Sequence, residues 1–379
     1  MENKAEKSLI PLAWVFYIFI VFEALIMITP FALYYYSAYG PVINFFNKLP
    51  QSHWLSSFFL PHFTQSNSWI LSSLMLIGMI FFTLGFIIFL AGAGQIYYSK
   101  LAKKGAVTGG LYKYVRHPQY TAFITMGFGV LLIMPRFIVL ITFVTMIFIY
   151  YFLARKEEKE CEEKYGEKFI QYTQNTAMFL PVKMPFLKKL PSLPPAGYGR
   201  KAAVFSLYGG TVAFTILFAL ALRNYSLSTL SVHYSDNMAT VSTAKMEKDK
   251  MQRIIATATG NAEVKNILKE AGYDNGEKFL NYIVPQEWYL SDLPLETRQE
   301  WANEGHFQPK DYNRDTYKVL FTKAVLSGDG NENGSDIIKK TVRRIPLIVV
   351  KLNSKNGEIT GLEDPPEHAR GVDVPMPLF

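Results

Sequence analysis

Five long apolar runs occupy much of the first 223 residues, and polar stretches separate them. Crossing the hydrocarbon core of a bilayer takes about 20 apolar residues, and most of the runs reach or approach that length. The third run is shorter and ends at Pro135, so we expect it to form one arm of a helical hairpin that turns at "MPRF". The runs cover residues 9–36, 69–98, 120–134, 137–153 and 202–222.

Composition agrees with a membrane protein. Half of the 379 residues are apolar and 18% are charged, whereas a soluble domain averages about a quarter charged residues. The first run is too long for the core of a signal peptide, and no small-residue cleavage site follows it, so we interpret it as a membrane helix. Cys161 is the single cysteine, which excludes an intrachain disulfide.

The positions of Lys and Arg predict the orientation. The stretch 37–68 holds one of them, Lys48, whereas 100–116 holds five and 155–201 holds ten. Positively charged loops stay in the cytoplasm, so we expect the N-terminus and both basic stretches there. The fifth helix then runs outward and places a C-terminal domain outside. An uncleaved membrane protein with a cysteine-free exported domain fits a bacterial inner membrane, which we take as the expected location.

The net charge is divided in the same way. After Arg223 the chain holds 19 basic and 22 acidic residues, a net charge of −3, while the preceding part holds 20 basic and 9 acidic residues, a net charge of +11. The overall charge of +8 therefore belongs to the loops that flank the membrane. It does not indicate nucleic-acid binding, and no motif supports such a partner.

These patterns predict an α-helical integral membrane protein with about five membrane helices, including a helical hairpin, and a C-terminal α+β soluble domain. We expect a membrane core over residues 1–181 and a Pro- and Lys-rich connector over 182–201. One more membrane helix over 202–223 leads to the exported domain over 224–379, which has a usual single-domain size.

The exported domain contains both helical and strand patterns. Helices are predicted over 243–260 and 261–272, and strands over 316–326 and 345–362. Asn261 is suited to cap the second helix and Gly272 to end it. Asn356 and Gly357 are expected to turn the last strand region into a hairpin.

One segment of this domain begins like a calcium loop. "DGNENGSDIIKK" places Asp329, Asn331 and Asn333 at ligand spacing, but Lys340 stands where a bidentate Glu is needed. We therefore interpret the segment as a solvated turn. No other residue of the domain indicates a chemistry, and its role stays open, with a protein partner among the options.

Two polar stretches flank the predicted hairpin, "VTGGLYKYVRHPQY" before it and "ARKEEKECEEKYGEKFIQY" after it. Because a hairpin returns its ends to one membrane face, we expect Arg116 and His117 to lie near Arg155, Glu157 and Glu158. With nearby tyrosines, these residues can hold a zwitterionic cofactor. The alternative is that basic residues and tyrosines anchor the helix ends, and that the second stretch is a solvated helix with Glu–Lys pairs.

Together the two stretches resemble the isoprenylcysteine carboxyl methyltransferase and phospholipid methyltransferase superfamily of integral membrane enzymes. The resemblance covers roughly residues 70–182. The family pattern is Gly-x-Tyr, then Arg-His-Pro-x-Tyr, then Glu-Glu followed by an apolar residue, an aromatic-Gly pair and two spaced aromatics. Here it falls on Gly110, Tyr112, Arg116, His117, Pro118, Tyr120, Glu157, Glu158, Cys161, Tyr165, Gly166, Phe169 and Tyr172.

The resemblance implies that S-adenosylmethionine binds from the cytoplasm and methylates a lipid or lipidated acceptor that enters laterally between helices. Glu158, with Glu157, would face the amino group of the cofactor, and Arg155 would orient the acceptor or the cofactor carboxylate. Arg155 and Glu158 are therefore the candidate catalytic residues, and no metal is expected. The candidate cofactor-binding residues are Tyr112, Arg116, His117, Pro118, Tyr120, Glu157, Glu158 and Tyr172.

Other functions stay open from the sequence. Membrane reductases that use NADPH on sterols or steroids carry similar Arg-His-Pro motifs, but they continue with Gly-Asp or Gly-Glu after the tyrosine, where this chain has "TAF". A non-catalytic anchor for an exported sensor or assembly domain is a second alternative. The acceptor itself, whether a prenylcysteine-like carboxylate, a phospholipid amine or another small lipophile, is not fixed.

Weaker signals lie elsewhere in the membrane part. Glu23, an ionisable residue inside the first run, is a functional hypothesis, and the alternative is a protonated or hydrogen-bonded carboxyl that faces another helix. The small residues within 85–95 favour close helix packing over phosphate binding, because no strand precedes them. His53 and His62 lack a third ligand and are interpreted as lone histidines.

Overall fold

The structure is a computed structural model, and it divides the chain into two compact units. The first comprises Met1–Ala38, Ile77–Leu132 and Val139–Phe214, and the second comprises Tyr39–Leu76, Ile133–Ile138 and Thr215–Phe379. Glu23 and most of the predicted connector lie outside the described residues. The described residues are 21–22, 24–47, 51–102, 107–181, 197–291, 293–295, 306–327 and 332–366.

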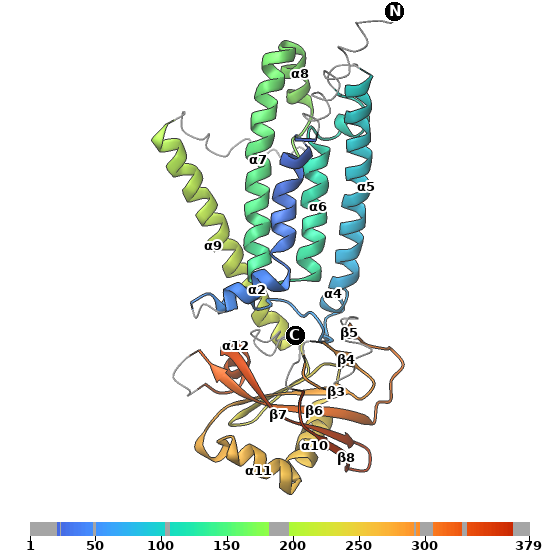
Figure 1. Cartoon of the computed structure of the whole chain (residues 1–379), viewed down its shortest axis with the longest axis vertical. Coiled ribbons are helices and arrows are strands. Elements are labelled where there is room, and N and C mark those ends of the chain that lie inside the picture. The colour runs from blue at the N-terminus through green and yellow to red at the C-terminus, as the bar shows by residue number, and fades with distance from the viewer. Residues whose placement is uncertain are drawn as a thin grey trace, which may run out of the picture. The chain divides into compact units, whose positions relative to one another are not determined.

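Apolar helices correspond to each of the five predicted runs. They are Ala24–Tyr36, α5 (Leu74–Leu101), α6 (Pro118–Ile133), α7 (Phe137–Tyr165) and α9 (Tyr198–Ser228). Of these, α5, α7 and α9 are long and apolar enough to cross a membrane, and the other two are shorter. Figure 1 shows α5, α6 and α7 side by side. The short turn between α6 and α7, which contains Pro135, confirms the predicted hairpin.

Short helices precede or follow these long ones. They are α2 (Gly40–Asn47), α3 (His53–Ser56), α4 (Trp69–Ser72), the 3-10 helix η1 (Gly110–Lys113) and α8 (Glu167–Asn175). The η1 turn immediately precedes the Arg-His-Pro motif, and α8 follows the polar end of α7. Both elements therefore belong to the neighbourhood of the candidate site.

The packing of α5 against α6 depends on glycines. A Cβ atom at Gly129 of α6 would lie 2.5 Å from the carbonyl oxygen of Gly78 in α5. Conversely, a Cβ atom at Gly85 of α5 would lie 2.7 Å from the carbonyl oxygen of Ala122 in α6. The two backbones thus approach each other closely at these glycines, and the prediction of close packing is confirmed at Gly85.

A six-stranded sheet forms the centre of the second unit. Its order is β1-β2-β3-β6-β7-β8, in which β2 and β3 run parallel and the other neighbours are antiparallel. The strands are β1 (Val232–Tyr234), β2 (Met238–Ser242), β3 (Phe279–Pro285), β6 (Thr316–Leu326), β7 (Thr341–Asn353) and β8 (Glu358–Glu363), and β4 (Tyr289–Leu290) pairs separately with β5 (His306–Phe307). The parallel step from β2 to β3 requires a crossover, which α10 (Lys248–Gly260) and α11 (Ala262–Glu270) supply.

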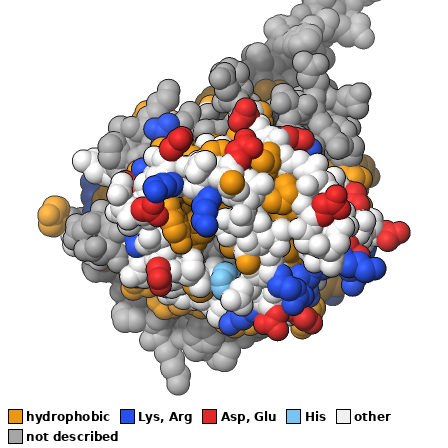
Figure 2. All heavy atoms as spheres, turned by 90° about the horizontal axis from the view of Figure 1, so that it is seen from below, with side chains coloured by type: hydrophobic (Ala, Val, Ile, Leu, Met, Phe, Trp, Pro, Cys, Tyr) orange, Lys and Arg blue, Asp and Glu red, His pale blue; other side chains and the backbone are white. Residues whose placement is uncertain are grey.

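The two faces of the sheet have different covers. Helices α10 and α11 lie over one face (Figure 1), where Met251 and Leu268 pack with Phe279. The core on the other face includes Ile337 of α12 (Ser335–Lys340) and Phe63 from the stretch between α3 and α4. On the face in Figure 2, charged side chains of both signs are interspersed with apolar ones, as on a solvated surface.

Several predictions for this domain are confirmed. The strand β6 has the predicted bounds, and β7 and β8 form the predicted hairpin with Gly357 at a φ of 71° in the turn. The side chain of Asn261 accepts hydrogen bonds from the backbone amides of Glu263 and Val264 and so caps α11 as expected. Gly272, at a φ of 99°, follows the end of that helix.

Other predictions for this domain are wrong. Helix α10 begins at Lys248 and not at residue 243, because the backbone amide of Thr243 donates to the carbonyl of Ile283 in β3. The predicted solvated turn instead leads into α12, whose Ile337 and Ile338 are fully buried. A short amphipathic helix can form there because its apolar side chains fill the core beneath the sheet.

The calcium-like segment is only partly described, since Asp329 and Asn331 lie outside the described residues. The side-chain oxygen of Asn333 accepts a hydrogen bond from Nζ of Lys278 at 3.0 Å, and Asn237 accepts another at 2.9 Å. The lysine ammonium thus lies between the two amide oxygens and ties the turn before β2 to the start of α12.

Replacing Asn261 with Ala should destabilise the second unit. The substitution removes the acceptor for two amides that no intrahelical partner can satisfy, at a cost of about 1 kcal/mol. Thermal unfolding of the full chain, followed by the fluorescence of the buried Trp288, measures the change. Asn261→Asp keeps the capping oxygen and is the control. Equal unfolding temperatures for the Ala and Asp variants would contradict the role of the cap.

Candidate active site

Three stretches meet at the candidate site: the segment before α6, the polar half of α7 and the region of α8. Pro118 is the first residue of α6, where its missing N–H costs nothing. The same proline disfavours a helical conformation at His117, so the motif enters the helix as an extended segment. Because α6 and α7 form a hairpin, this segment lies against Glu157 and Glu158 of α7.

Glu158 is the centre of the charged cluster. Its Oε1 accepts from Nε of Arg116 at 2.6 Å and lies 3.2 Å from Nε2 of His117. Its Oε2 lies 3.4 Å from Nη1 of Arg155. The side chain of Glu158 is only 8% exposed, so these three groups compensate for the desolvation of its charge. The expected proximity of these residues is confirmed.

His117 lies between two carboxylates. Its Nδ1 is 3.4 Å from Oε2 of Glu157, and its Nε2 faces Glu158. Both ring nitrogens can donate only when the imidazole is protonated. Burial of the ring lowers the pKa of His117, but the hydrogen bonds and charges of Glu157 and Glu158 outweigh burial and raise that pKa above its ordinary value.

This geometry predicts a pH-dependent stability. Because the pKa of His117 is higher in the folded chain, its stabilising contribution is fully present below about pH 6.5 and is lost as the pH rises through the raised value. We expect wild type to unfold at a higher temperature than His117→Gln near pH 6, and the difference to shrink at higher pH. Calorimetric scans of both proteins across this range test the prediction. A difference that stays constant with pH would contradict it.

Arg116 also connects α8 to the hairpin. Its Nη1 donates to the carbonyl of Thr173 at 2.9 Å and to that of Thr176. The backbone amide of Arg116 donates to Ala177 at 2.9 Å, and the amide of His117 donates to Met178. The chain after α8 therefore lies along the motif and covers it.

Two tyrosines of the motif, Tyr112 of η1 and Tyr172 of α8, contact each other. The hydroxyl of Tyr172 in α8 donates to the carbonyl of Tyr112 at 2.5 Å. Burial raises the pKa of Tyr172 to about 12 and also raises that of Tyr112, so both hydroxyls stay protonated. The hydroxyl of Tyr112 donates to Gln119 at 2.9 Å. Neither tyrosine is therefore a candidate base, and both hold elements in place.

Aromatic rings continue from the charged cluster along α6. The hydroxyl of Tyr120 donates to Oε1 of Glu157, and its ring stacks on that of His117 with centroids 5.5 Å apart. The ring of Tyr150 in α7 also stacks on that of Tyr120, with centroids 4.8 Å apart. Tyr120 and Tyr150 are both buried, so this packed column fixes the orientation of the groups that Tyr120 contacts.

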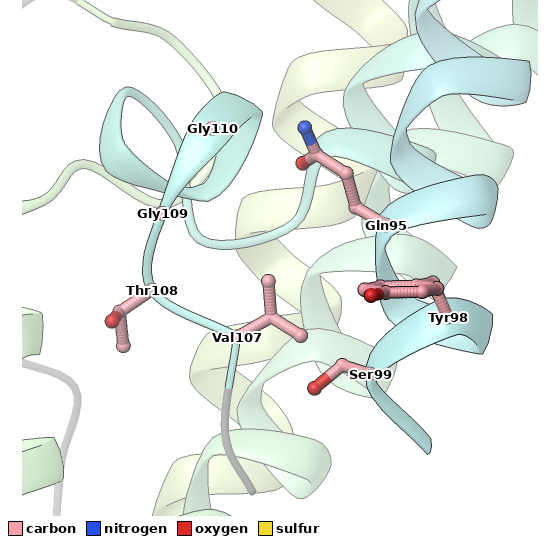
Figure 3. A pocket seen from close by; sticks show the side chains of 7 residues that line it. All are labelled: Gln95, Tyr98, Ser99, Val107, Thr108, Gly109 and Gly110. Carbon is pink, nitrogen blue, oxygen red and sulfur yellow. The ribbon is translucent and has the colours of Figure 1, made fainter. Parts of the chain in front are cut away.

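A pocket of about 370 Å³ lies beside η1, between the end of α5 and the loop before η1 (Figure 3). The side chain of Gln95 points towards the turn, and its Oε1 accepts from the amide of Leu111 at 3.1 Å. Gly110 has a φ of 60°, and a Cβ atom there would meet the Gln95 amide at 2.2 Å. Among the residues that the structure describes, those that line the pocket are uncharged: Gln95, Tyr98, Ser99, Val107, Thr108, Gly109 and Gly110.

Exposure separates the predicted site residues into two groups. Arg116, His117 and Glu158 are largely buried, whereas the side chains of Arg155 and Glu157 are 57% and 50% exposed. The buried residues satisfy one another, and the exposed ones can be reached by a ligand. The sequence patterns did not single out Gln95 and Gln119, which hydrogen-bond to Leu111 and Tyr112. A polar residue next to the end of an apolar run was the signal that could have indicated them.

The apolar helices and the charged cluster at one end of their hairpin define a membrane protein with a candidate active site. Residues 68–168 match the sequence model of the phospholipid methyltransferase family. This match is to the membrane methyltransferase superfamily that the motif indicated, so the resemblance over this part of the chain is confirmed. The match spans 101 of the 379 residues. No curated protein and no solved structure matches the chain.

Proposed function

We propose that the protein transfers a methyl group from S-adenosylmethionine to a lipophilic acceptor at the membrane surface. The observation that carries the proposal is the network in which Arg116, His117 and Arg155 surround Glu158, within the segment that matches the methyltransferase family. Bound S-adenosylmethionine supplies an activated methyl group on a sulfonium. The remaining task of the protein is to bind and align the two reactants.

The residues present fit the charges of this cofactor. Its zwitterionic end needs a carboxylate for the ammonium and a guanidinium for the carboxylate, and Glu157 and Arg155 supply these groups on the exposed side of the cluster. Glu158 and Arg116, whose charges are already paired, hold the exposed groups in position. The pocket beside Gly110, whose described lining residues carry no charge, suits a neutral polar part of a ligand.

The acceptor and the location remain part of the proposal. An acceptor carboxylate needs no base, whereas an amine must lose a proton before or during attack, and Glu157 or Glu158 would then take it. The excess of Lys and Arg around the motif supports a cytoplasmic site, and we assign the protein to a bacterial inner membrane with the C-terminal domain outside. The domain boundaries given above belong to the same proposal.

Titration of S-adenosylhomocysteine into the detergent-purified full chain tests the proposal directly. We expect saturable binding, followed by methyl transfer to one member of a panel of aminophospholipids, prenylcysteines and isoprenoid acids. A parallel titration with NADPH addresses the reductase alternative, which the family match does not support. Binding of NADPH without binding of S-adenosylhomocysteine to well-folded protein would overturn the proposal.

A further inference from the structure

Residues 56–67, here called the coupling loop, hold the turn between α6 and α7. The amide of Phe59 donates to the carbonyl of Pro135 at 2.9 Å, and the amide of Phe137 donates to that of Ser57 at 3.2 Å. These backbone bonds attach one end of the loop to both sides of the hairpin turn. The hairpin is therefore fixed at the point where α6 ends and α7 begins.

Stacked side chains reinforce this attachment and extend it. The guanidinium carbon of Arg136 lies 3.8 Å from the centre of the Phe58 ring. The ring of His62 stacks on Phe58 with centroids 4.8 Å apart, and His306 of β5 meets His62 at 5.2 Å. A cation over an aromatic face is attractive. Together these contacts form a continuous stack that connects the hairpin turn, the coupling loop and the C-terminal domain of strands β1 to β8, here called the extramembrane domain after its expected location.

The other end of the coupling loop is bonded to the extramembrane domain. The bonds are Gln65 N to Thr243 O at 2.8 Å, Asn67 N to Thr229 O at 2.8 Å, Ser66 Oγ to Thr229 Oγ1 at 2.7 Å and Gln308 Nε2 to Phe63 O at 2.6 Å. The rings of Phe58 and Phe63 are buried in the same core as Leu280 of β3 and Leu320 of β6, and Met134 of the hairpin turn packs against it. The loop is thus part of the core of the domain.

We propose that the extramembrane domain, through the coupling loop, sets the alignment of the α6–α7 hairpin and thereby the affinity of the cluster at the other ends of these helices. The helix α7 is continuous in sequence from Phe137 at the turn to Glu157, a helical length of about 30 Å. A shift at the turn therefore displaces Glu157 and Glu158 relative to Arg116 and His117. The domain is a regulator of the site, and its effect on ligand affinity rests on the proposed function.

Full-chain variants that loosen the coupling loop test this proposal. Phe63→Ala removes a ring from the shared core. Gln308→Ala removes only the hydrogen bond to the carbonyl of Phe63, and it serves as the test variant if Phe63→Ala fails to fold. Ile345→Ala, an apolar truncation at a partly exposed position of β7, is the matched control. Two quantities are measured for each protein: hydrogen exchange of the backbone over residues 56–67 and 112–121, and the Kd for S-adenosylhomocysteine.

We expect faster exchange in both segments for the loosened variants and an affinity for S-adenosylhomocysteine lowered about 3- to 30-fold. Faster exchange over 56–67 alone, with the exchange over 112–121 and the affinity equal to those of Ile345→Ala, would overturn the proposal. Unchanged exchange over 56–67 in both variants would also overturn it. If the wild type binds no S-adenosylhomocysteine, the proposed function fails, and the exchange over 112–121 still decides whether the domain and the site are coupled.

Discussion

Replacing Glu158 with Gln is expected to weaken S-adenosylhomocysteine binding by at least about 100-fold and to lower the unfolding temperature. The carboxylate is buried and contacts Arg116, His117 and Arg155. Gln keeps the size but removes the charge and turns an NH₂ group towards cationic donors. Removing one partner of a buried ion pair costs about 3–5 kcal/mol. Calorimetric titration and a thermal scan of the same preparation measure both effects.

Two further variants separate the loss of binding from a general loss of stability. Glu160→Gln changes the same residue type two positions along α7, where the side chain is 65% exposed and pairs with Lys156 at 3.9 Å. Such a surface pair contributes less than about 1 kcal/mol, so affinity and stability should stay near wild type. Glu157→Gln, at a half-exposed position, should lose affinity with little loss of stability. A folded Glu158→Gln protein that binds within threefold of wild type would refute the assignment.

The cluster could be predicted from the sequence because it depends on chain topology. Pro135 ends one apolar arm, and a hairpin must return its ends to the same side, so Arg116 and His117 had to meet Glu157 and Glu158. The sequence could not show which of Glu157 and Glu158 is buried. Adjacent residues on a helix face different directions, and only the packing of the folded chain decides the environment of each. The roles of these residues stay predictions.

The C-terminal domain was harder to predict. The β-branched and aromatic residues of β6 and the Asn-Gly turn after β7 are local signals, and both predicted the observed elements. Strand β2 and helix α12 were missed because their side chains are stabilised by partners far away in sequence. The coupling loop gave no signal for the same reason: Phe63 is buried by residues more than 150 positions later, such as Leu227 and Leu320.

Substituting Gly129 with Ala should destabilise the membrane part, although Ala favours helices over Gly by about 1 kcal/mol. The new Cβ atom would lie 2.5 Å from the oxygen of Gly78 and 2.6 Å from the nitrogen of Phe82. These are backbone atoms of α5 that cannot rotate away, so the two helices must separate. Overpacking of this kind costs about 1–3 kcal/mol. Thermal unfolding in detergent should show a lower midpoint than wild type.

Gly92→Ala provides the matched control, because its Cβ atom would lie 3.5 Å from Pro118, an ordinary van der Waals distance. That variant should be neutral or slightly more stable, as helix propensity alone requires. Separation of α5 from α6 also moves Gln95 away from the amide of Leu111, so Gly129→Ala should weaken S-adenosylhomocysteine binding as well. If both alanine variants raise the unfolding midpoint equally, the helices do not touch at Gly129, and the close α5–α6 contact that positions η1 and the pocket is refuted.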